Sequence, residues 1–327
     1  MKEYKSLLTM YETQKGIEKL KNYFQQALSY ELNLTRVSAP LFVLSETGFN
    51  DDLNGTEKAV DFTVCGKTAE IVHSLAKWKR HALKKYDFTL HSGLYTDMNA
   101  VRKDETEDCI HSYYVDQWDW EYIIKEKERT DEKLEIIVQK IYNAILNTEK
   151  YIVEEFPKLN RVLPEKIHFI TTQELYDMYP DSSPKERENA ICKEYGAVFL
   201  KQIGKKLTNN SSHDGRSPDY DDWDLNGDLL VWYEELNMAL ELSSMGIRVD
   251  KDKLLKQLEL SGQVQRLEKE YHQLIVKGIL PFTIGGGIGQ SRLAMFFLKK
   301  LHIGEVQVSI WSEKTKNECE KIGIELL

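Results

Sequence analysis

The sequence predicts an α+β fold in which a central, mostly antiparallel sheet is flanked by helices. Strand-like segments follow one another over 93–124 and again over 197–249, without the regular alternation with helices that a parallel sheet requires. Apolar residues at helical spacing over 4–29 and 132–156 predict helices long enough to cover such a sheet. The chain has 327 residues, of which 41% are hydrophobic, so it can build a large core. No linker or repeat divides it, and we expect one domain over 1–327.

The other elements follow from local patterns. Pro40 interrupts the extended segment 34–43 and confines it to the edge of a sheet or to a junction. A turn-rich loop is expected at 50–55. In chain order we further expect strands at 59–64, 69–72, 93–102, 112–124, 166–171, 197–203, 229–232 and 238–249, helices at 75–86, 185–195 and 252–276, and a polar loop at 208–224.

Composition and charge exclude several classes of protein. The chain has 44 basic and 53 acidic residues and a formal net charge of -9, which argues against a broad nucleic-acid-binding surface. An anionic substrate would therefore need positive charge concentrated in a cleft. The four cysteines are far apart and form no metal-ligand pair, so reduced thiols and a cytoplasmic location are expected. No apolar run approaches the length of a membrane span, and we expect no membrane partner.

The most informative segment is the glycine-rich run 283–292, Thr-Ile-Gly-Gly-Gly-Ile-Gly-Gln-Ser-Arg. Four glycines in five residues remove side chains from a short stretch of backbone, so a flat ligand could lie against the peptide planes. Arg292 follows at the expected start of a helix and could stack on a base or pair with phosphate oxygens. From the residues alone, a nucleotide floor and a tight structural turn are both open.

The strand 112–121 carries a second signal. Because side chains alternate along a strand, one face carries Gln117, Asp119 and Glu121, and the other carries Asp116 and two tryptophans. Buried carboxylates need partners. This pattern predicts either a structural ion-pair network or the polar floor of a pocket.

Charged residues at strand ends suggest further contacts. Arg102 closes one predicted strand and suits a phosphate, although an arginine in that position is more often solvated. Asp228 and Glu241 lie at the ends of two apolar segments, and magnesium accepts two such carboxylates when phosphates fill its other positions. Strict alternation would put Glu241 and Ser244 on opposite faces, so a shared role requires a bulge near Ser243. Surface carboxylates are the alternative.

Two acidic loops, at 50–55 and 216–223, allow two interpretations. Turn chemistry alone explains their Asp and Asn residues. A carboxylate in each loop could instead hold a substrate ammonium group.

Together these features resemble the catalytic core of class II aminoacyl-tRNA synthetases, whose three signature motifs are similar to 35–43, 93–121 and 283–298 of this chain. Longer strings resemble more closely the ammonia-dependent asparagine synthetases, the aspartate–ammonia ligase family. These strings are 73–80 (HSLAKWKR), 114–121 (YVDQWDWE), 218–223 (PDYDDW), 241–248 (ELSSMGIR) and 285–292 (GGGIGQSR).

The resemblance implies a single catalytic domain that converts L-aspartate, ATP and ammonia to L-asparagine, AMP and pyrophosphate through a β-aspartyl adenylate. ATP is then a substrate and Mg²⁺ a cofactor, no nucleic acid takes part, and a homodimer pairs near Pro40. Asp51 would bind ammonium and act as base, although the family pattern has Asp-Asn where this chain has Asp51-Asp52.

The remaining roles implied by the resemblance fall into three groups. Arg102, Arg292 and the backbone of Gly285, Gly286, Gly287 and Gly289 would hold the nucleotide; Asp228 and Glu241 would hold magnesium, with Ser244 nearby; and Ser74, Lys79, Gln117, Asp119, Arg216, Asp221, Ser244 and Arg248 would surround aspartate. Asp51, Arg102, Gln117 and Arg292 would be catalytic.

Two alternatives remain at this stage. An aspartyl- or asparaginyl-tRNA synthetase would need an anticodon-binding module, for which the chain shows neither spare length nor a basic flank. A catalytically silent, synthetase-like regulatory protein would be expected to lack a metal carboxylate or a phosphate arginine, whereas this sequence has both.

Overall fold

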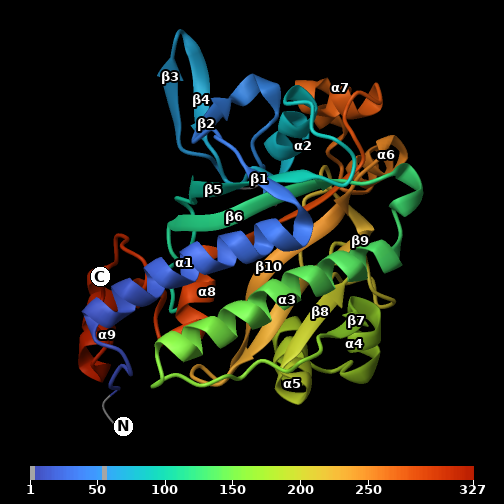
Figure 1. The fold of residues 1–327 in the computed structure, drawn as a ribbon. Helices are drawn as coiled ribbons and strands as arrows, with labels where there is room; N and C mark the ends of the chain where they lie inside the picture. The colour runs from blue at the N-terminus through green and yellow to red at the C-terminus, as the bar shows by residue number, and fades with distance from the viewer. Residues whose placement is uncertain (1–3, 54–56) are drawn as a thin grey trace.

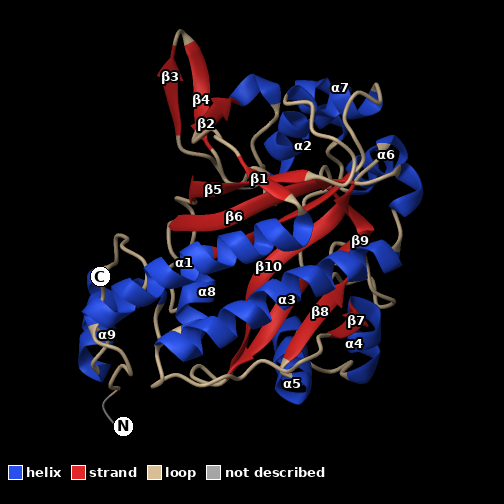
Figure 2. Ribbon diagram, in the orientation of Figure 1, coloured by secondary structure: helices blue, strands red, loops and turns tan. Residues whose placement is uncertain are grey.

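A computed structural model describes residues 4–53 and 57–327, and its central element is an eight-stranded sheet (Figure 2). The strands lie in the order β1-β5-β6-β11-β10-β9-β8-β7. Their bounds are β1 Leu34–Arg36, β5 Gly93–Val101, β6 Tyr114–Ile123, β7 His168–Thr171, β8 Ala197–Lys201, β9 Asp221–Tyr233, β10 Met238–Arg248 and β11 Thr283–Gly289. The β1–β5 and β7–β8 pairs are parallel and the others antiparallel, so the predicted fold class is confirmed.

Two long helices, α1 (Met10–Leu32) and α3 (Asp131–Glu155), lie side by side across one face of this sheet (Figure 1). Thr9 begins α1 through a capping box with Glu12, which satisfies backbone N–H groups that have no partner within the helix. The helix buries its apolar stripe, including Phe24, whose ring centroid lies 4.6 Å from that of Trp118 on β6. Helix α8 (Gln290–Phe297) packs into the same core.

The opposite face carries shorter elements. Helix α2 (Ala76–Lys85) contacts β6 and β11. A three-stranded sheet projects beside α2, in the order β2-β4-β3 (Figure 1). The remaining elements are β2 Phe42–Leu44, β3 Asp61–Val64, β4 Lys67–Ile71, α4 Thr172–Met178, α5 Pro184–Tyr195, α6 Lys251–Leu260, α7 Glu270–Val276 and α9 Glu313–Ile322. Among the helices of the described residues, none is both long and apolar enough to cross a membrane.

The local predictions hold for most elements. The segment around Pro40 forms two short strands, one at the edge of the large sheet and one in the small sheet, as a proline-interrupted segment should. The predicted strand pair at 59–72 is the antiparallel pair β3–β4. Residues 54 and 55 of the expected loop at 50–55 lie outside the described residues.

Three predicted elements are wrong in part. The first helix begins at Met10 instead of residue 4, because Thr9 caps it. The single long helix predicted at 252–276 is two helices, because Gly262 takes a left-handed conformation (φ 67°) between α6 and α7 and interrupts the helical hydrogen bonds. The polar loop predicted at 208–224 ends early, because β9 begins at Asp221.

The glycine-rich run is a central strand, so the alternative of a tight turn is wrong. β11 pairs with β6 on one side and β10 on the other. None of its glycines has a positive φ, so the run needs glycine for space and not for a special backbone conformation. Its last residue caps α8, which brings Arg292 into the first turn of that helix as predicted.

Gly93 shows how closely the strands pack around the site. A Cβ at Gly93 would lie 2.2 Å from the carbonyl oxygen of Glu121 on the neighbouring strand. The backbone of β6 cannot move away cheaply, and the Leu34 side chain closes the other side at 2.7 Å. We therefore expect Gly93→Ala to reduce the free energy of unfolding by about 1–3 kcal/mol. Urea denaturation with an unchanged m-value would measure this. A midpoint equal to that of the wild type would show that the strands separate more easily than this packing implies.

Candidate active site

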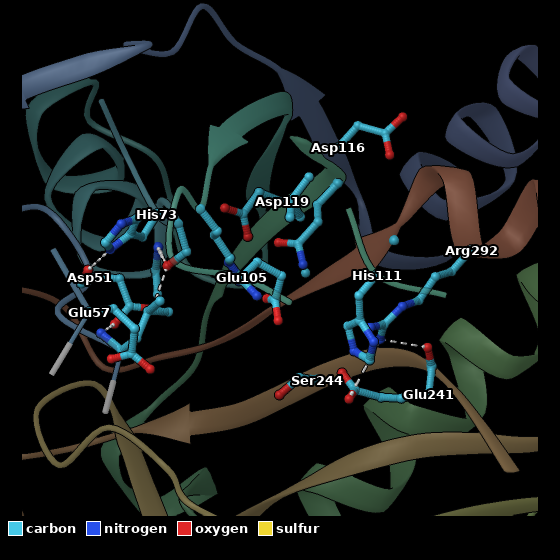
Figure 3. Close-up of a pocket in the computed structure, with 18 of the residues that line it drawn as sticks. Asp51, Glu57, His73, Glu105, His111, Asp116, Asp119, Glu241, Ser244 and Arg292 are labelled. Carbon is cyan, nitrogen blue, oxygen red and sulfur yellow. Dashed lines mark hydrogen bonds and ion pairs between the residues drawn. The ribbon is translucent and has the colours of Figure 1, made fainter. Parts of the chain in front are cut away.

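A cavity of about 440 Å³ opens on the face of the sheet opposite α1 (Figure 3). In Figure 3, Asp51 and His73 lie at one end and Arg292 with Glu241 at the other, with Asp119 and Ser244 between them. Most of the predicted site residues line it: Asp51, Ser74, Lys79, Arg102, Gln117, Asp119, Arg216, Asp221, Glu241, Ser244, Arg248, Gly286, Gly287, Gly289 and Arg292. Asp228 lies behind Arg216, and Gly285 lies beneath the Glu121–Arg248 ion pair.

The polar floor of the cavity comes from β6, as the alternation predicts. Gln117 and Asp119 line the cavity, and Glu121 on the same face is fully buried beside it. Trp118 and Trp120 point to the other face and belong to the main hydrophobic core. The alternation therefore sorted Gln117, Asp119 and the tryptophans correctly between site and core. Asp116, which it placed on the tryptophan face, also lines the cavity.

The glycines of β11 lie directly against this polar row. The cross-strand pairs are Gly285 with Glu121, Gly287 with Asp119, and Gly289 with Gln117. A Cβ at Gly287 would lie 2.4 Å from Oε1 of Gln117, and one at Gly285 would lie 1.9 Å from Oε2 of Glu121. The glycines thus leave room for the polar side chains of β6 to lean over β11.

Lys79 is the most buried cation of the cavity wall. It extends from α2, forms an ion pair with Asp119, and donates a hydrogen bond to the carbonyl of Gly286 at 2.9 Å. Burial lowers the pKa of Lys79 and the charge of Arg248 adds to this, while Asp119 opposes it. A bound anion in the cavity would favour the charged amine.

Arg248, on β10, is held between two carboxylates. Its guanidinium pairs with Glu121 at 2.7 Å and with Asp221, and it lies over the ring of Tyr220 at 5.6 Å. These charges raise the pKa of Arg248 further above its ordinary value, although burial opposes them. The group is therefore a fixed, permanently charged part of the cavity wall.

Arg216 connects the cavity to the predicted metal ligands. Its guanidinium contacts Ser244, and Nη2 lies 2.5 Å from Oδ1 of Asp228. The register of β10 against β9 shifts between Glu241 and Ser243, so the bulge that a shared role requires is present and lets both Glu241 and Ser244 face the cavity. Burial raises the pKa of Asp228 to about 6; the charge of Glu241 adds to this, whereas Arg216 opposes it.

Two other arginines of the cavity wall have fewer partners. Arg292 lies 3.7 Å from the Glu241 carboxylate and donates to the Glu241 carbonyl at 3.3 Å. Arg102 directly follows β5, and its buried Nε has no hydrogen-bond partner among the described residues. A buried guanidinium N–H without an acceptor is costly, which is consistent with an anionic ligand in this part of the cavity.

Asp51 and Asp52 lie in different surroundings. Asp51 lines the cavity and accepts hydrogen bonds from the Ser74 hydroxyl (2.8 Å) and the Leu53 N–H (2.9 Å). Asp52 turns away from the cavity toward Lys77, whose Nζ lies 3.2 Å from it, with Arg266 and Lys269 at 3.6 Å. Only one of the adjacent carboxylates is therefore presented to a ligand.

A buried ion cluster connects the loop that carries Asp51 and Asp52 with the loop that carries Arg216. Asp219, fully buried, accepts from Lys77 and Arg266 at 2.8 Å and contacts His272 at 2.9 Å. Burial opposes its ionisation, but Lys77 and the other partners hold the pKa of Asp219 well below its usual value. The cluster ties the loop that carries Arg216 to α2 and α7.

This cluster predicts a pH-dependent stability effect. Asp219→Asn would leave Lys77 buried beside a weaker partner, so we expect a loss of about 3–5 kcal/mol in the free energy of unfolding at neutral pH. Because the folded state lowers the pKa of Asp219, its contribution is complete above the unfolded value of 3.8 and is lost as the pH falls below it. Denaturation of both proteins from pH 7 to pH 3 should show the difference shrinking. A constant difference would contradict an ionised Asp219.

Several residues of the cavity wall were not singled out from sequence. His73, Tyr220, Glu105, His111 and Gln307 all line it. His73 and Tyr220 lie within the strings 73–80 and 218–223. Glu105 and His111 lie on the loop after Arg102. Closeness in sequence to predicted site residues was therefore the signal that could have found these four. Gln307 comes from a distant segment without any recognisable pattern, and only the fold brings it here.

Solved structures share the fold at low sequence identity. The asparaginyl-tRNA synthetase of Entamoeba histolytica in complex with asparaginyl-adenylate matches with a TM-score of 0.68 and 13% identity, covering 91% of this chain and 66% of that one. The asparaginyl-tRNA synthetase of Pyrococcus horikoshii complexed with asparaginyl-adenylate gives 0.63 and 18%, covering 90% and 68%. The fold is therefore that of the class II aminoacyl-tRNA synthetase catalytic core.

Sequence comparison is more specific. The family model for aspartate-ammonia ligase matches residues 11–323. The aspartate–ammonia ligase of Fusobacterium nucleatum is 57% identical over 325 residues, covering 99% of both chains, and that of Clostridium perfringens is 56% identical over 329 residues, covering 100% of this chain and 98% of the other. This chain belongs to the aspartate–ammonia ligase family.

Proposed function

We propose that the enzyme forms L-asparagine, AMP and pyrophosphate from L-aspartate, ATP and ammonia through a β-aspartyl adenylate. The observation that carries this proposal is the division of one cavity into two charged ends. Arg102 and Arg292 follow the ends of β5 and β11, which both pair with the first half of β6, and they have few partners. Lys79 and Arg248 lie nearer the start of β11, among carboxylates. One end suits a polyphosphate and the other a zwitterionic amino acid.

In this proposal the amino-acid end binds aspartate. Lys79, Arg216 and Arg248 would face its two carboxylates. Asp119 and Asp221 would face its ammonium group. Gln117, Ser74 and Ser244 supply neutral hydrogen-bonding groups on the same wall. Because cations and carboxylates alternate here, both ends of a zwitterion find a partner of opposite charge.

The arginine end would hold ATP. Arg102 and Arg292 would contact the phosphates and the base, over the backbone of Gly286, Gly287 and Gly289. The predicted role of Gly285 in this floor is wrong, because the Glu121–Arg248 pair covers it and it does not line the cavity. The β-carboxylate of aspartate then attacks the α-phosphorus, and pyrophosphate leaves with its electron pair. Fixed guanidinium groups stabilise the negative charge that gathers on the phosphate oxygens in this displacement. The resulting mixed anhydride has AMP as a good leaving group.

In this proposal Asp228 and Glu241 would hold a magnesium ion; Glu241 lines the cavity, whereas Asp228 lies behind Arg216 and is paired with it. They are carboxylates on neighbouring strands, and such oxygen ligands suit magnesium. Burial and the charge of Glu241 raise the pKa of Asp228, while Arg216 opposes this rise. Among the described residues no group of three or more His, Cys, Asp or Glu is arranged to hold a metal. When bound, the ion would neutralise phosphate charge.

Asp51 would prepare ammonia for the second step. Ammonium must lose a proton before its nitrogen can attack the activated carbonyl. The Asp51 carboxylate faces the cavity, whereas Asp52 is neutralised by Lys77, Arg266 and Lys269. We therefore propose Asp51 as the proton acceptor. The nitrogen then bonds to the carbonyl carbon, and the bond from carbon to the AMP oxygen breaks.

Product analysis tests the proposal. With aspartate, ATP, magnesium and an ammonium salt, we expect asparagine and AMP in equal amounts. Formation of ADP and phosphate would overturn the adenylate route. Added tRNA should not become charged with aspartate or asparagine.

We further propose that residues 1–327 act as one catalytic unit and pair as a homodimer near Pro40. Leu41 and Phe42, beside this proline, are 51% and 44% exposed, and Phe42 contacts the Phe62 ring at 5.0 Å. Such an apolar patch suits a subunit contact. The cytoplasmic location remains a prediction from the sequence.

A further inference from the structure

Glu121 is the centre of a buried network to which the proposed reaction assigns no role. It is fully buried and does not line the cavity. Its Oε1 accepts from Arg248 Nε at 2.9 Å and from the Thr283 hydroxyl at 2.7 Å, and its Oε2 accepts from Arg248 Nη2 at 2.7 Å. Burial opposes its ionisation, but Arg248 in particular holds the pKa of Glu121 below its ordinary value.

The two bonds to Arg248 fix the plane of the guanidinium. Nε and Nη2 both face Glu121, and Nη1 faces Asp221. A bidentate pair of this kind restricts both the position and the orientation of an arginine. Lys79 Nζ also lies 4.0 Å from Oε2 of Glu121, so the negative charge of Glu121 also attracts a second cation of the cavity wall.

Gly285 provides the space for this carboxylate. A Cβ on Gly285 would lie 1.9 Å from Oε2 of Glu121 and 2.5 Å from Nη2 of Arg248. Any other residue would therefore push apart the pair that holds Arg248 in place. The other glycines that face the cavity meet different groups: Gly287 lies against Gln117, and Gly289 lies against Arg292.

We propose that Glu121, seated over Gly285, is a positioning residue that sets Arg248 and Lys79 for the carboxylates of aspartate. This inference rests on the proposed function, because it takes aspartate as the ligand of that end. Glu121 acts only through the two cations. Its removal should therefore weaken the use of aspartate and leave the use of ATP unchanged, which a general loss of stability would not do.

Steady-state kinetics of three variants test this role. We expect Glu121→Gln to raise the KM for aspartate by about tenfold or more, because a charge-assisted pair to Arg248 is lost, with the KM for ATP within about twofold of wild type. Thr283→Val removes one hydrogen bond to Glu121 at nearly constant volume, and we expect a rise of about threefold to tenfold in the KM for aspartate. Gly285→Ala should behave like Glu121→Gln.

Matched controls separate this effect from loss of a buried polar group in general. Glu149, 2% exposed, accepts from the Val162 and Leu163 N–H groups far from the cavity, and Thr148, 0% exposed, donates to a backbone carbonyl. Glu149→Gln and Thr148→Val should lower the unfolding midpoint but change neither KM.

The kinetic results of these variants either support or overturn the role of Glu121. A selective rise in the aspartate KM for Thr283→Val and Gly285→Ala supports the inference even where Glu121→Gln fails to fold. An equal rise in the ATP KM for Gly285→Ala, or unchanged aspartate constants in all three variants, overturns it. Calorimetric binding of aspartate to wild type and Thr283→Val keeps the test separate from the proposed function. If wild type forms no AMP, the reaction is wrong, while this comparison still decides the role of Glu121.

Discussion

Arg292→Ala is expected to reduce aspartate-dependent exchange of pyrophosphate into ATP by about 10³-fold, the effect of removing a cation that stabilises a phosphoryl transition state. The side chain comes from the first turn of α8 and reaches the cavity beside Glu241. Its ion pair is 3.7 Å long and its side chain is 23% exposed, so its loss should change the free energy of unfolding by no more than about 1 kcal/mol.

Two further arginine variants serve as comparisons for Arg292→Ala. Arg102→Ala should cause a loss of similar size, since Arg102 also lines the cavity and its buried Nε has no partner in the described residues. Arg161→Ala, which removes a half-exposed arginine outside the cavity, should leave exchange unchanged. If folded Arg292→Ala exchanged pyrophosphate at the wild-type rate, the proposed phosphate-binding role of Arg292 would be wrong.

Asp51→Ala is expected to separate the two chemical steps. The variant should still exchange pyrophosphate at close to the wild-type rate, because the adenylate forms without ammonia. Formation of asparagine from ammonium should fall by about 10²–10⁴-fold, the contribution typical of a positioned general base. Rapid-quench measurement of adenylate and of asparagine in the same reaction would show the first accumulating without the second.

Asp52→Asn is the matched control. Its carboxylate points to Lys77 and Arg266 and does not line the cavity, so the ammonia step should keep most of its rate. If Asp51→Ala lost adenylate formation and ammonia use equally, Asp51 would be a binding residue. If Asp52→Asn alone lost the ammonia step, the assignment of the base would pass to Asp52.

Much of the site follows from local sequence patterns. Alternation along β6 correctly placed Gln117 and Asp119 toward the cavity and Trp118 toward the core, because the direction of side chains in a strand has a fixed period of two. The bulge near Ser243 is the one that a shared role of Glu241 and Ser244 requires, although the sequence left open whether they share a role. These inferences need only the chain within one element.

Other predictions failed or stayed open for want of tertiary information. The helix predicted at 252–276 is broken at Gly262, because a charged amphipathic pattern continues on both sides of a residue whose left-handed conformation stops the helix. The choice between Asp51 and Asp52 could not be made from two adjacent identical side chains. It depends on Lys77, Arg266 and Lys269, which come from distant parts of the chain.

The sequence by itself determined the fold class, the family resemblance and the residue types that meet in the cavity. Only the tertiary structure decided what the glycines of β11 lie against. Gly285 faces Glu121 and Gly287 faces Asp119 because of the register between two strands far apart in the chain. Register is set by the packing of the whole sheet, and the period of one strand cannot reveal which residue of another lies opposite it.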